Sequence, residues 1–273
     1  MNGAGNDFLI FCDLECKLTD EMLPRLAKTL CHRRLSIGAD GIMVVRPAEA
    51  GGDYRMLFFN ADGSLGEMCG NGARCICRYG YEMGLAGETQ RVETTAGLVT
   101  GTRIDARNYR IRLNDPSVIK LEYPLEVGGK VYAGAYVELG NPGLPHGVVP
   151  MKDLSSIPEH ELREVGRALR WHEGYPKGAN VNFCEVIAPD CIRIKTFERG
   201  VEDFTLACGT GSGSTAAVLT LLGQVTGEEV RVISDGGELR VTVELEGNTV
   251  KNLWLTGPTN IVCEGDVLDE DLS

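Results

Sequence analysis

One short motif occurs twice in this 273-residue chain, and the repeat limits the architectures that the chain can adopt. Cys69-Gly-Asn-Gly in the first half is echoed by Cys208-Gly-Thr-Gly in the second half, 139 residues further on. Four weaker echoes follow in the same order, at spacings of 135, 140, 140 and 142 residues. They pair Gly5-Asn-Asp with Gly140-Asn-Pro, Gly38-Ala-Asp with Gly178-Ala-Asn, Thr95-Ala-Gly with Asp235-Gly-Gly, and residues 110–113 with 253–255. Because a long-period repeat marks duplicated structural units, the sequence predicts two related halves.

Alternating or short apolar runs predict strands in both halves. They cover residues 8–11, 42–45, 56–59, 99–104, 182–187, 192–197 and 239–245. Two helices are predicted directly after the cysteine motifs, over 70–83 and 209–222, and two more over 20–30 and 157–170. The helix over 209–222 is apolar on nearly every side, which is typical of a buried helix. We therefore expect a mixed α/β (α+β) protein with two pseudo-symmetric domains, each a curved, mostly antiparallel sheet or barrel around a central buried helix.

The expected domain boundary lies near residue 117. Residues 1–117, joined by the C-terminal segment 261–273, form the half that carries Cys69, and residues 118–260 form the half that carries Cys208. The active site is expected in the cleft between the two halves.

Composition excludes several classes of function. A formal net charge of −12 disfavours nucleic acid as a partner. No stretch approaches the roughly 20 apolar residues of a membrane span, and the N-terminus lacks the pattern of a secretion signal. We therefore expect a cytoplasmic protein whose ten cysteines are free thiols. The cysteines and the four histidines show no paired spacing typical of a metal site, so no metal is expected.

The cysteine motifs themselves predict chemistry. The first turn of a helix presents unpartnered backbone N–H groups and the positive end of the helix dipole, and glycine lets a ligand approach closely. This environment binds an anion such as an α-carboxylate and favours a thiolate over a thiol. Two such thiols around one small anion can remove a proton from one face of a carbon and return one to the other face. A tight turn beside a core cysteine is the plainer interpretation of either motif alone.

Taken together, the motifs resemble the diaminopimelate epimerase family, and the resemblance covers essentially the whole chain. The segments that carry it are residues 2–8, 59–64, Met68-Cys-Gly-Asn-Gly-Ala-Arg74, Gly140-Asn-Pro142, Glu198-Arg-Gly200, Ala207-Cys-Gly-Thr-Gly211 and Leu255-Thr-Gly-Pro258. The resemblance implies two similar α/β domains and interconversion of L,L- and meso-diaminopimelate without pyridoxal phosphate, metal or other cofactor. It also implies that Cys69 and Cys208 are the two acid/base residues, one as thiolate and one as thiol. A homodimer is a further expectation that comes from the family.

The resemblance also assigns the substrate contacts. The reacting carboxylate is expected at the amides of Gly70-Asn71 and Gly209-Thr210, and the distal end of the substrate at Asn60, Asn180 and Arg199. The guanidinium of Arg199 offers a planar fork for a carboxylate. The remaining family contacts are Asn6, Asn141 and Glu198.

Three departures from the family pattern are visible. Histidine usually follows Gly-Asn-Pro directly, whereas three residues intervene here before His146, so its place beside a cysteine stays open. Gly41 stands where some members have a polar side chain. The chain begins almost at the first motif, so the strand that normally precedes it is expected to be absent.

Other functions remain open to the sequence. A related two-cysteine racemase of another amino acid, such as histidine, would keep the mechanism and change the distal contacts. A non-catalytic amino-acid-binding protein would need only one of the thiols, and a thiol hydrolase would need a histidine base beside its cysteine. If both thiols flank one carbon, oxidation is expected to join Cys69 and Cys208 in a disulfide.

Overall fold

The computed structural model describes residues 1–66, 69–268 and 270, and it divides into two compact units. Unit 1 comprises Met1–Ile111 and Gly257–Ser273, and unit 2 comprises Arg112–Thr256. The chain passes between the units twice, within strands β7 (Asn108–Leu113) and β18 (Thr249–Pro258). Met68 of the first cysteine motif, and residues 269 and 271–273 of the expected C-terminal segment, lie outside the described residues.

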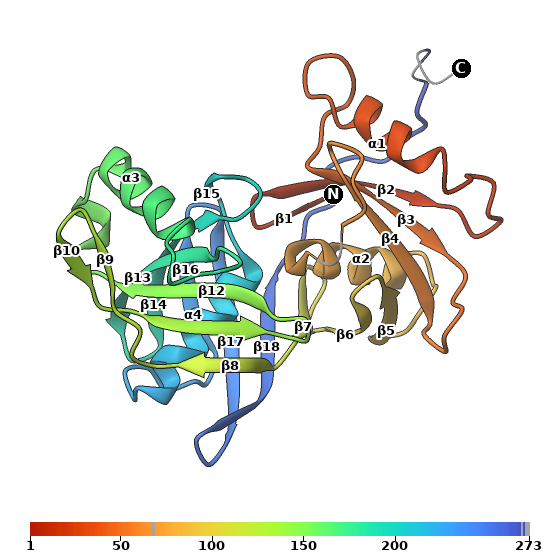
Figure 1. The fold of residues 1–273 in the computed structure, drawn as a ribbon. Helices are drawn as coiled ribbons and strands as arrows, with labels where there is room; N and C mark the ends of the chain where they lie inside the picture. Colours follow the sequence, from red (N-terminus) through yellow and green to blue (C-terminus); the bar gives the residue numbers. More distant parts are fainter. Residues whose placement is uncertain (67–68, 269, 271–273) are drawn as a thin grey trace. The chain divides into compact units, whose positions relative to one another are not determined.

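Unit 1 is a sheet with two helices, drawn in red to yellow in Figure 1. Its strands are β1 (Asn2–Gly3), β2 (Asn6–Cys12), β3 (Gly41–Arg46), β4 (Tyr54–Asn60), β5 (Thr89–Thr94), β6 (Gly97–Arg103) and β7. They lie side by side in chain order. The pairs β2/β3 and β4/β5 are parallel, and the other pairs are antiparallel. Each parallel pair is connected through a helix, α1 (Leu23–Leu30) or α2 (Gly70–Glu82), as parallel strands require a long crossover.

Unit 2 has a larger sheet. Its strands are β8 (Pro116–Lys120), β11 (Ala135–Leu139), β12 (Leu144–Pro150), β13 (Asn180–Ala188), β14 (Cys191–Glu198), β15 (Asp203–Thr205), β16 (Val230–Ser234), β17 (Gly237–Glu246) and β18. The order is β18-β17-β16-β14-β13-β12-β11-β8, with β15 paired to β14. The pairs β12/β13 and β14/β16 are parallel and the rest antiparallel. Strands β9 (Leu125–Val127) and β10 (Lys130–Tyr132) form a separate hairpin.

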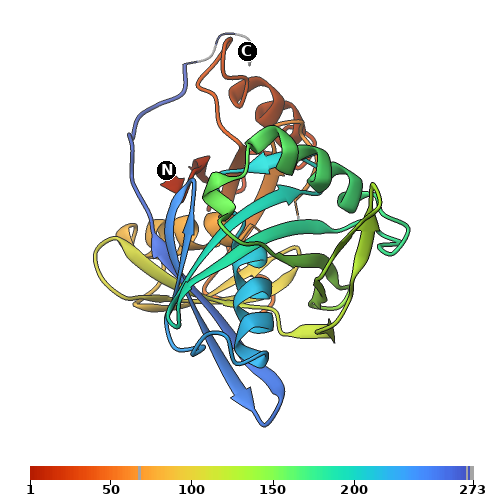
Figure 2. The same cartoon turned by 90° about the vertical axis from the view of Figure 1, so that its left-hand side faces the viewer.

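One helix in each unit is largely buried. In α2 the burial runs from Gly70 to Cys77, and this helix packs on β1, β2 and β6. Helix α4 (Gly209–Leu221) has no charged side chain and is buried along most of its length against β11, β12, β13, β14 and β17. Figure 2 shows α4, in light blue, running alongside the strands of its own sheet. The prediction of an apolar, buried helix over 209–222 is therefore confirmed.

The other helix of unit 2, α3 (Glu159–Arg170), buries Leu162 and Leu169 against Phe197 and neighbouring apolar side chains. The predicted starts of α1 and α3 were two to three residues too early, because a proline sits at each start. Pro24 lies in the first turn of α1, and Pro158 is the N-cap of α3, with an extended ψ of 133°. Proline tolerates the first turn of a helix but cannot continue one from before it.

The coarse prediction of a mixed α/β fold with a mostly antiparallel sheet is confirmed, with four α-helices in the described part of the chain. The sequence analysis did not predict β1, β5, β8, β11, β12 and β16, nor the short strands β9, β10 and β15. The last three strands have three residues each, too few to show a period-two alternation.

Candidate active site

Cys69 is the N-cap residue of α2. Its backbone is extended, with φ −113° and ψ 120°, and its carbonyl accepts a hydrogen bond of 2.7 Å from the Ala73 amide. The side chain is partly exposed, while Gly70 and Asn71 behind it are buried. The thiol therefore stands where the free N–H groups of the first turn and the helix dipole both stabilise negative charge.

Cys208 occupies the same position at the start of α4, with φ −116° and ψ 111°. Its sulfur accepts a hydrogen bond of 3.3 Å from the Gly211 amide and lies 3.5 Å from Thr210 Oγ1. The thiol is buried, as is Gly209 next to it. The Gly211 amide is thus a donor to this sulfur, whereas in the contact with Thr210 either atom can donate.

A hydrogen-bonded chain of side chains backs Cys69 within unit 1. Asn71 Nδ2 donates to Asn6 Oδ1 at 2.6 Å, and Arg74 donates to Asn71 Oδ1 at 2.8 Å. Asn6 in turn donates to Asp40 Oδ2 at 2.9 Å. Asn6 and Asn71 thus belong to one rigid group, with both amide orientations fixed.

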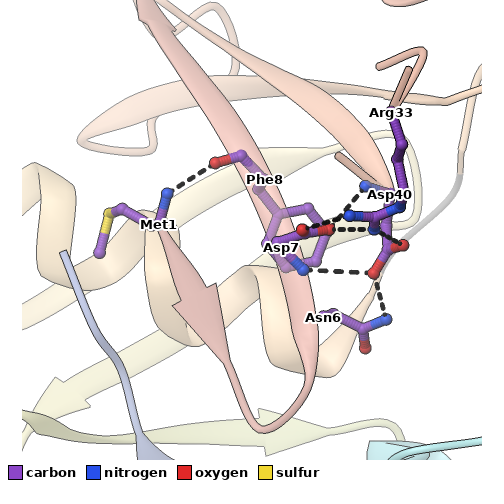
Figure 3. Close-up of polar contacts among 6 residues, drawn as sticks. All are labelled: Met1, Asn6, Asp7, Phe8, Arg33 and Asp40. Carbon is purple, nitrogen blue, oxygen red and sulfur yellow. Dashed lines mark hydrogen bonds and ion pairs between the residues drawn. The ribbon is translucent and has the colours of Figure 1, made fainter. Parts of the chain in front are cut away.

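Arg33 is hydrogen-bonded to Asp40, the last residue of this hydrogen-bonded series, as Figure 3 shows. Its guanidinium bonds both carboxylate oxygens of Asp7, at 2.7 and 2.8 Å, and Asp40 Oδ1 at 2.8 Å. Partial burial works to raise the pKa of Asp7, but the hydrogen bonds and charge of Arg33 outweigh it and lower that pKa. The hydrogen bond to Asp7 is the largest cause that raises the pKa of Arg33. This ion cluster fixes Asp40, and through it Asn6.

The other predicted contact of unit 1 is Asn60, at the end of β4. Its Nδ2 donates to Ser64 Oγ at 3.0 Å, and the Ser64 hydroxyl donates to Asp62 at 2.5 Å. The turn over 60–64 therefore orients the Asn60 amide.

In unit 2, Asn180 and Arg199 lie together at neighbouring ends of β13 and β14. Asn180 Oδ1 accepts a hydrogen bond of 2.7 Å from the Arg199 backbone amide. The Arg199 side chain donates to the Lys177 carbonyl at 3.3 Å and forms no ion pair with a carboxylate of the described chain. Glu198 accepts from the Thr205 hydroxyl at 2.8 Å. The guanidinium of Arg199 is therefore held by the backbone and keeps its charge uncompensated locally.

His146 lies in β12, paired in register with Asn180 of β13. It is fully buried, and this burial, with a smaller effect of Arg199, lowers its pKa to about 3. Its Nδ1 lies 3.3 Å from Asn182 Nδ2, and its Nε2 has no hydrogen-bond partner among the described residues of its unit. The imidazole is therefore neutral at physiological pH.

Asn182, which sequence reasoning missed, connects His146 to the helix of Cys208. A Cβ on Gly211 would lie 2.3 Å from Asn182 Oδ1 and 3.2 Å from Cys208 Sγ. Of the three residues between Gly-Asn-Pro and the histidine, Gly143 lies in the turn, while Leu144 and Pro145 begin β12 and pair with β11, so His146 lies inside the sheet. The only local signal in the sequence was that Asn180 and Asn182 are polar, although they occupy the alternating positions of β13 that are apolar further along the strand.

Asn141 is placed differently from the other predicted contacts. It lies exposed in the turn between β11 and β12, where Leu139 pairs with Leu144. In unit 1, Asn6 and Asn71 thus belong to one hydrogen-bonded group and Asn60 to the separate turn over 60–64, and unit 2 has one group around Asn180 and one around Cys208. Cavities of about 350 and 330 Å³ open in unit 2, and no predicted site residue lines either of them.

Among the described residues, no three His, Cys, Asp or Glu side chains are arranged to hold a metal ion. All ten cysteines are free thiols. The described helices include none with the length and apolarity to cross a membrane.

Comparison with solved structures defines the class of fold. The chain superposes on a hydroxyproline epimerase from Agrobacterium vitis with a TM-score of 0.64 at 18% identity, covering 90% of this chain and 80% of that one. It superposes on a phenazine biosynthesis protein of the PhzF family from Enterococcus faecalis with a TM-score of 0.65 at 14% identity, covering 94% and 89%. The fold is thus the two-domain fold that amino-acid epimerases share with PhzF-type proteins.

Sequence comparison gives the family. The diaminopimelate epimerase family model matches residues 1–117 and 139–262. The diaminopimelate epimerase of Aquifex aeolicus is 37% identical over 281 residues, which cover 100% of this chain and 98% of that protein. The enzyme of that name from Archaeoglobus fulgidus is 36% identical, covering 97% and 94%. The chain belongs to the diaminopimelate epimerase family.

Proposed function

We propose that this protein interconverts L,L- and meso-diaminopimelate by two-base proton transfer at one α-carbon, a reaction of lysine and cell-wall precursor biosynthesis. The observation that carries the proposal is the pair of cysteines at equivalent N-cap positions, one in each unit. The full-length similarity to named diaminopimelate epimerases supports the choice of substrate.

Equivalent topologies support the inference that the two units are pseudo-symmetric duplicates. The series β2-α1-β3-β4-α2-β5-β6-β7 has the same order and the same parallel pairs as β12-α3-β13-β14-α4-β16-β17-β18. Each cysteine precedes the second helix of its series. The proposal requires the two units to face each other so that these equivalent thiols approach one carbon from opposite faces.

The chemistry then divides between the cysteines. A thiolate on one takes the α-proton, and the thiol on the other gives its proton to the opposite face of the resulting carbanion. One S–H bond forms and one breaks, so atoms and charge balance and the cysteines exchange roles. The amides at Gly70-Asn71 and Gly209-Thr210 would hold the reacting carboxylate, where two helix dipoles stabilise the charge that develops. No cofactor is needed in this scheme.

The distal end of the substrate carries a second carboxylate and a second ammonium group. It therefore needs one binding site for an anion and one for a cation. We assign its carboxylate to Arg199 and its polar contacts to Asn60 and Asn180, with Asn6, Asn71 and Glu198 completing the site. Asn141 joins this set only if the turn that carries it folds inward, because it is exposed here. The proposed enzyme is a cytoplasmic homodimer with its active site in a cleft between the domains.

Deuterium exchange tests this function. Wild-type protein in D₂O should convert L,L-diaminopimelate into the meso isomer and incorporate solvent deuterium at one α-carbon. Cys69→Ala and Cys208→Ala should each reduce epimerisation at least about 100-fold, because each removes one of two obligatory proton carriers. Epimerisation that survives loss of either thiol would contradict the two-base scheme.

A panel of amino-acid substrates distinguishes the proposed epimerase from a racemase of another amino acid. Chiral chromatography after incubation with diaminopimelate, histidine, proline and lysine should show turnover of diaminopimelate fastest. Faster turnover of an amino acid without a zwitterionic distal end would contradict diaminopimelate as the substrate and leave the two-base mechanism unchanged.

A further inference from the structure

Arg74 is a fully buried cation that forms no ion pair with a carboxylate of residues 1–66, 69–268 or 270. Its side chain has no solvent exposure. Its hydrogen bonds go to neutral acceptors, the Gly70 carbonyl at 3.3 Å and Asn71 Oδ1 at 2.8 Å. Its Nε has no hydrogen-bond partner in the described part of the chain. Burying a charge without a counter-charge is costly, so a group that becomes negative nearby would offset that cost.

Burial lowers the pKa of Arg74, and among the described ionisable groups the thiols of Cys75 and Cys69 act in the opposite direction. Cys75 is buried within α2, and desolvation raises its pKa to about 12, so it stays protonated. The Met1 ammonium and Arg78, which also face Cys75, do not offset that desolvation. Cys69 differs because it is partly exposed and caps the helix. It is therefore the group that can become the counter-charge of Arg74.

The second unit offers no equivalent cation. Arg74 follows Cys69 by five residues, and the fifth residue after Cys208 is Gly213. A Cβ at Gly213 would lie 2.6 Å from Leu113, so an apolar side chain takes the place next to the helix. Helix α4 carries no charged residue at all. The two halves therefore repeat the thiol but not the buried charge.

We propose that Arg74 is a positioning residue that stabilises the thiolate of Cys69, so that in the free enzyme Cys69 is the base and Cys208 carries the proton. The guanidinium acts through space and through Asn71, which it orients. The free enzyme would then deprotonate the isomer whose α-hydrogen faces Cys69. The kinetic consequence rests on the proposed epimerase activity, whereas the thiol ionisation does not.

Alkylation of the substrate-free protein measures that ionisation directly. Iodoacetamide reacts with the thiolate, and tandem mass spectrometry assigns the label to each cysteine as pH is varied. We expect the alkylation midpoint of Cys69 in the wild type to lie below that of Cys208. In Arg74→Met, the Cys69 midpoint should rise by about one to two pH units, because an opposite charge within about 4–6 Å lowers a pKa by that order. Arg74→Lys should restore most of the low midpoint.

Arg78→Met is the matched control, because it removes an arginine one turn further along α2. It should leave the Cys69 midpoint near the wild-type value. Circular dichroism checks that each variant is folded. If Arg74→Met is not folded, the Cys69 midpoint is compared between the wild type and Arg74→Lys. A Cys69 midpoint that is equal in wild type, Arg74→Met and Arg74→Lys would overturn the proposal.

Kinetics separate this inference from the proposed function. If the protein is the epimerase, the acidic limb of the pH profile of kcat/KM should move to higher pH in Arg74→Met. The effect of this substitution on KM should be smaller. A shifted Cys69 midpoint in a protein without epimerase activity would contradict the proposed function and leave the role of Arg74 intact.

Discussion

Asn182 fixes the tautomer of His146. Asn182 Nδ2 donates to the Gly147 carbonyl at 3.0 Å, and its Oδ1 accepts from the Thr196 hydroxyl at 2.9 Å, so the orientation of the amide is determined. The amide nitrogen therefore faces His146 Nδ1, which must accept. Since the ring is neutral, its proton is on Nε2. His146 is thus a hydrogen-bond donor at Nε2 and not a base there.

Replacing Asn182 should release that constraint. Asn182→Ala removes three hydrogen bonds in a fully buried place and leaves buried partners unsatisfied, which should cost about 2–4 kcal/mol of unfolding free energy. Urea unfolding measures this cost. Nitrogen chemical shifts of His146 should show the Nε2–H form alone in the wild type and a mixture in the variant. A mixture already present in the wild type contradicts the assignment.

The depressed pKa of His146 predicts how stability depends on pH. The unfolded state binds a proton near pH 6.5 and the folded state only near pH 3. Stability from this residue is therefore complete above pH 6.5 and falls as pH drops toward 3, by up to about 1.4 kcal/mol per pH unit. Unfolding free energies between pH 7 and 4.5 should show this slope in the wild type and a shallower one in His146→Gln. Equal slopes would mean that His146 is protonated in the folded protein.

Arg33 should matter more for orientation than for stability. Its ion pairs with Asp7 and Asp40 are partly exposed, so Arg33→Met should cost only about 1 kcal/mol of unfolding free energy. Asp40 loses its position in the variant and no longer fixes Asn6, so KM for the substrate should rise several-fold. Arg34→Met, at an exposed neighbour, is the control and should change neither quantity. An unchanged KM in Arg33→Met would show that Asn6 needs no such support.

Gly211 should tolerate no side chain. In Gly211→Ala the methyl group would lie 2.3 Å from Asn182 Oδ1 and must displace it or the first turn of α4. Overpacking of this kind costs about 1–3 kcal/mol, and the hydrogen bond to Cys208 Sγ should weaken with it. Thermal unfolding and kcat measure the two effects. Gly87→Ala, where a Cβ meets no atom within 4 Å, should be neutral in both.

Oxidation offers a test of the proposed meeting of the two thiols. Treatment with diamide, in the absence of substrate, should join Cys69 and Cys208 and abolish activity, and dithiothreitol should restore it. Peptide mapping identifies the bond. An oxidised and inactive protein in which both thiols remain alkylatable would contradict the proposed geometry.

Local patterns allowed much of the fold to be predicted. The strands around residues 42–45, 56–59 and 192–197, and the helices after both cysteines, follow from periodicity and from glycine-rich helix starts. Strands of five to seven residues such as β5, β12 and β16 were missed, and other errors lie where local patterns conflict or are too short. Pro24 and Pro158 shifted two helix starts, and β15 has only three residues.

By itself, the sequence determined the two cysteine motifs at helix starts and the family, because each is written in short contiguous motifs. Only the tertiary structure decided that Arg74 is buried with no carboxylate of the described residues paired to it, that Arg33 reaches Asp7, and that Asn182 stands between His146 and Gly211. These contacts join residues 26 to 36 positions apart, or separate elements of the sheet, and no local periodicity encodes them. Burial and charge compensation depend on the whole packed environment of a side chain, so they emerge only once the chain is folded.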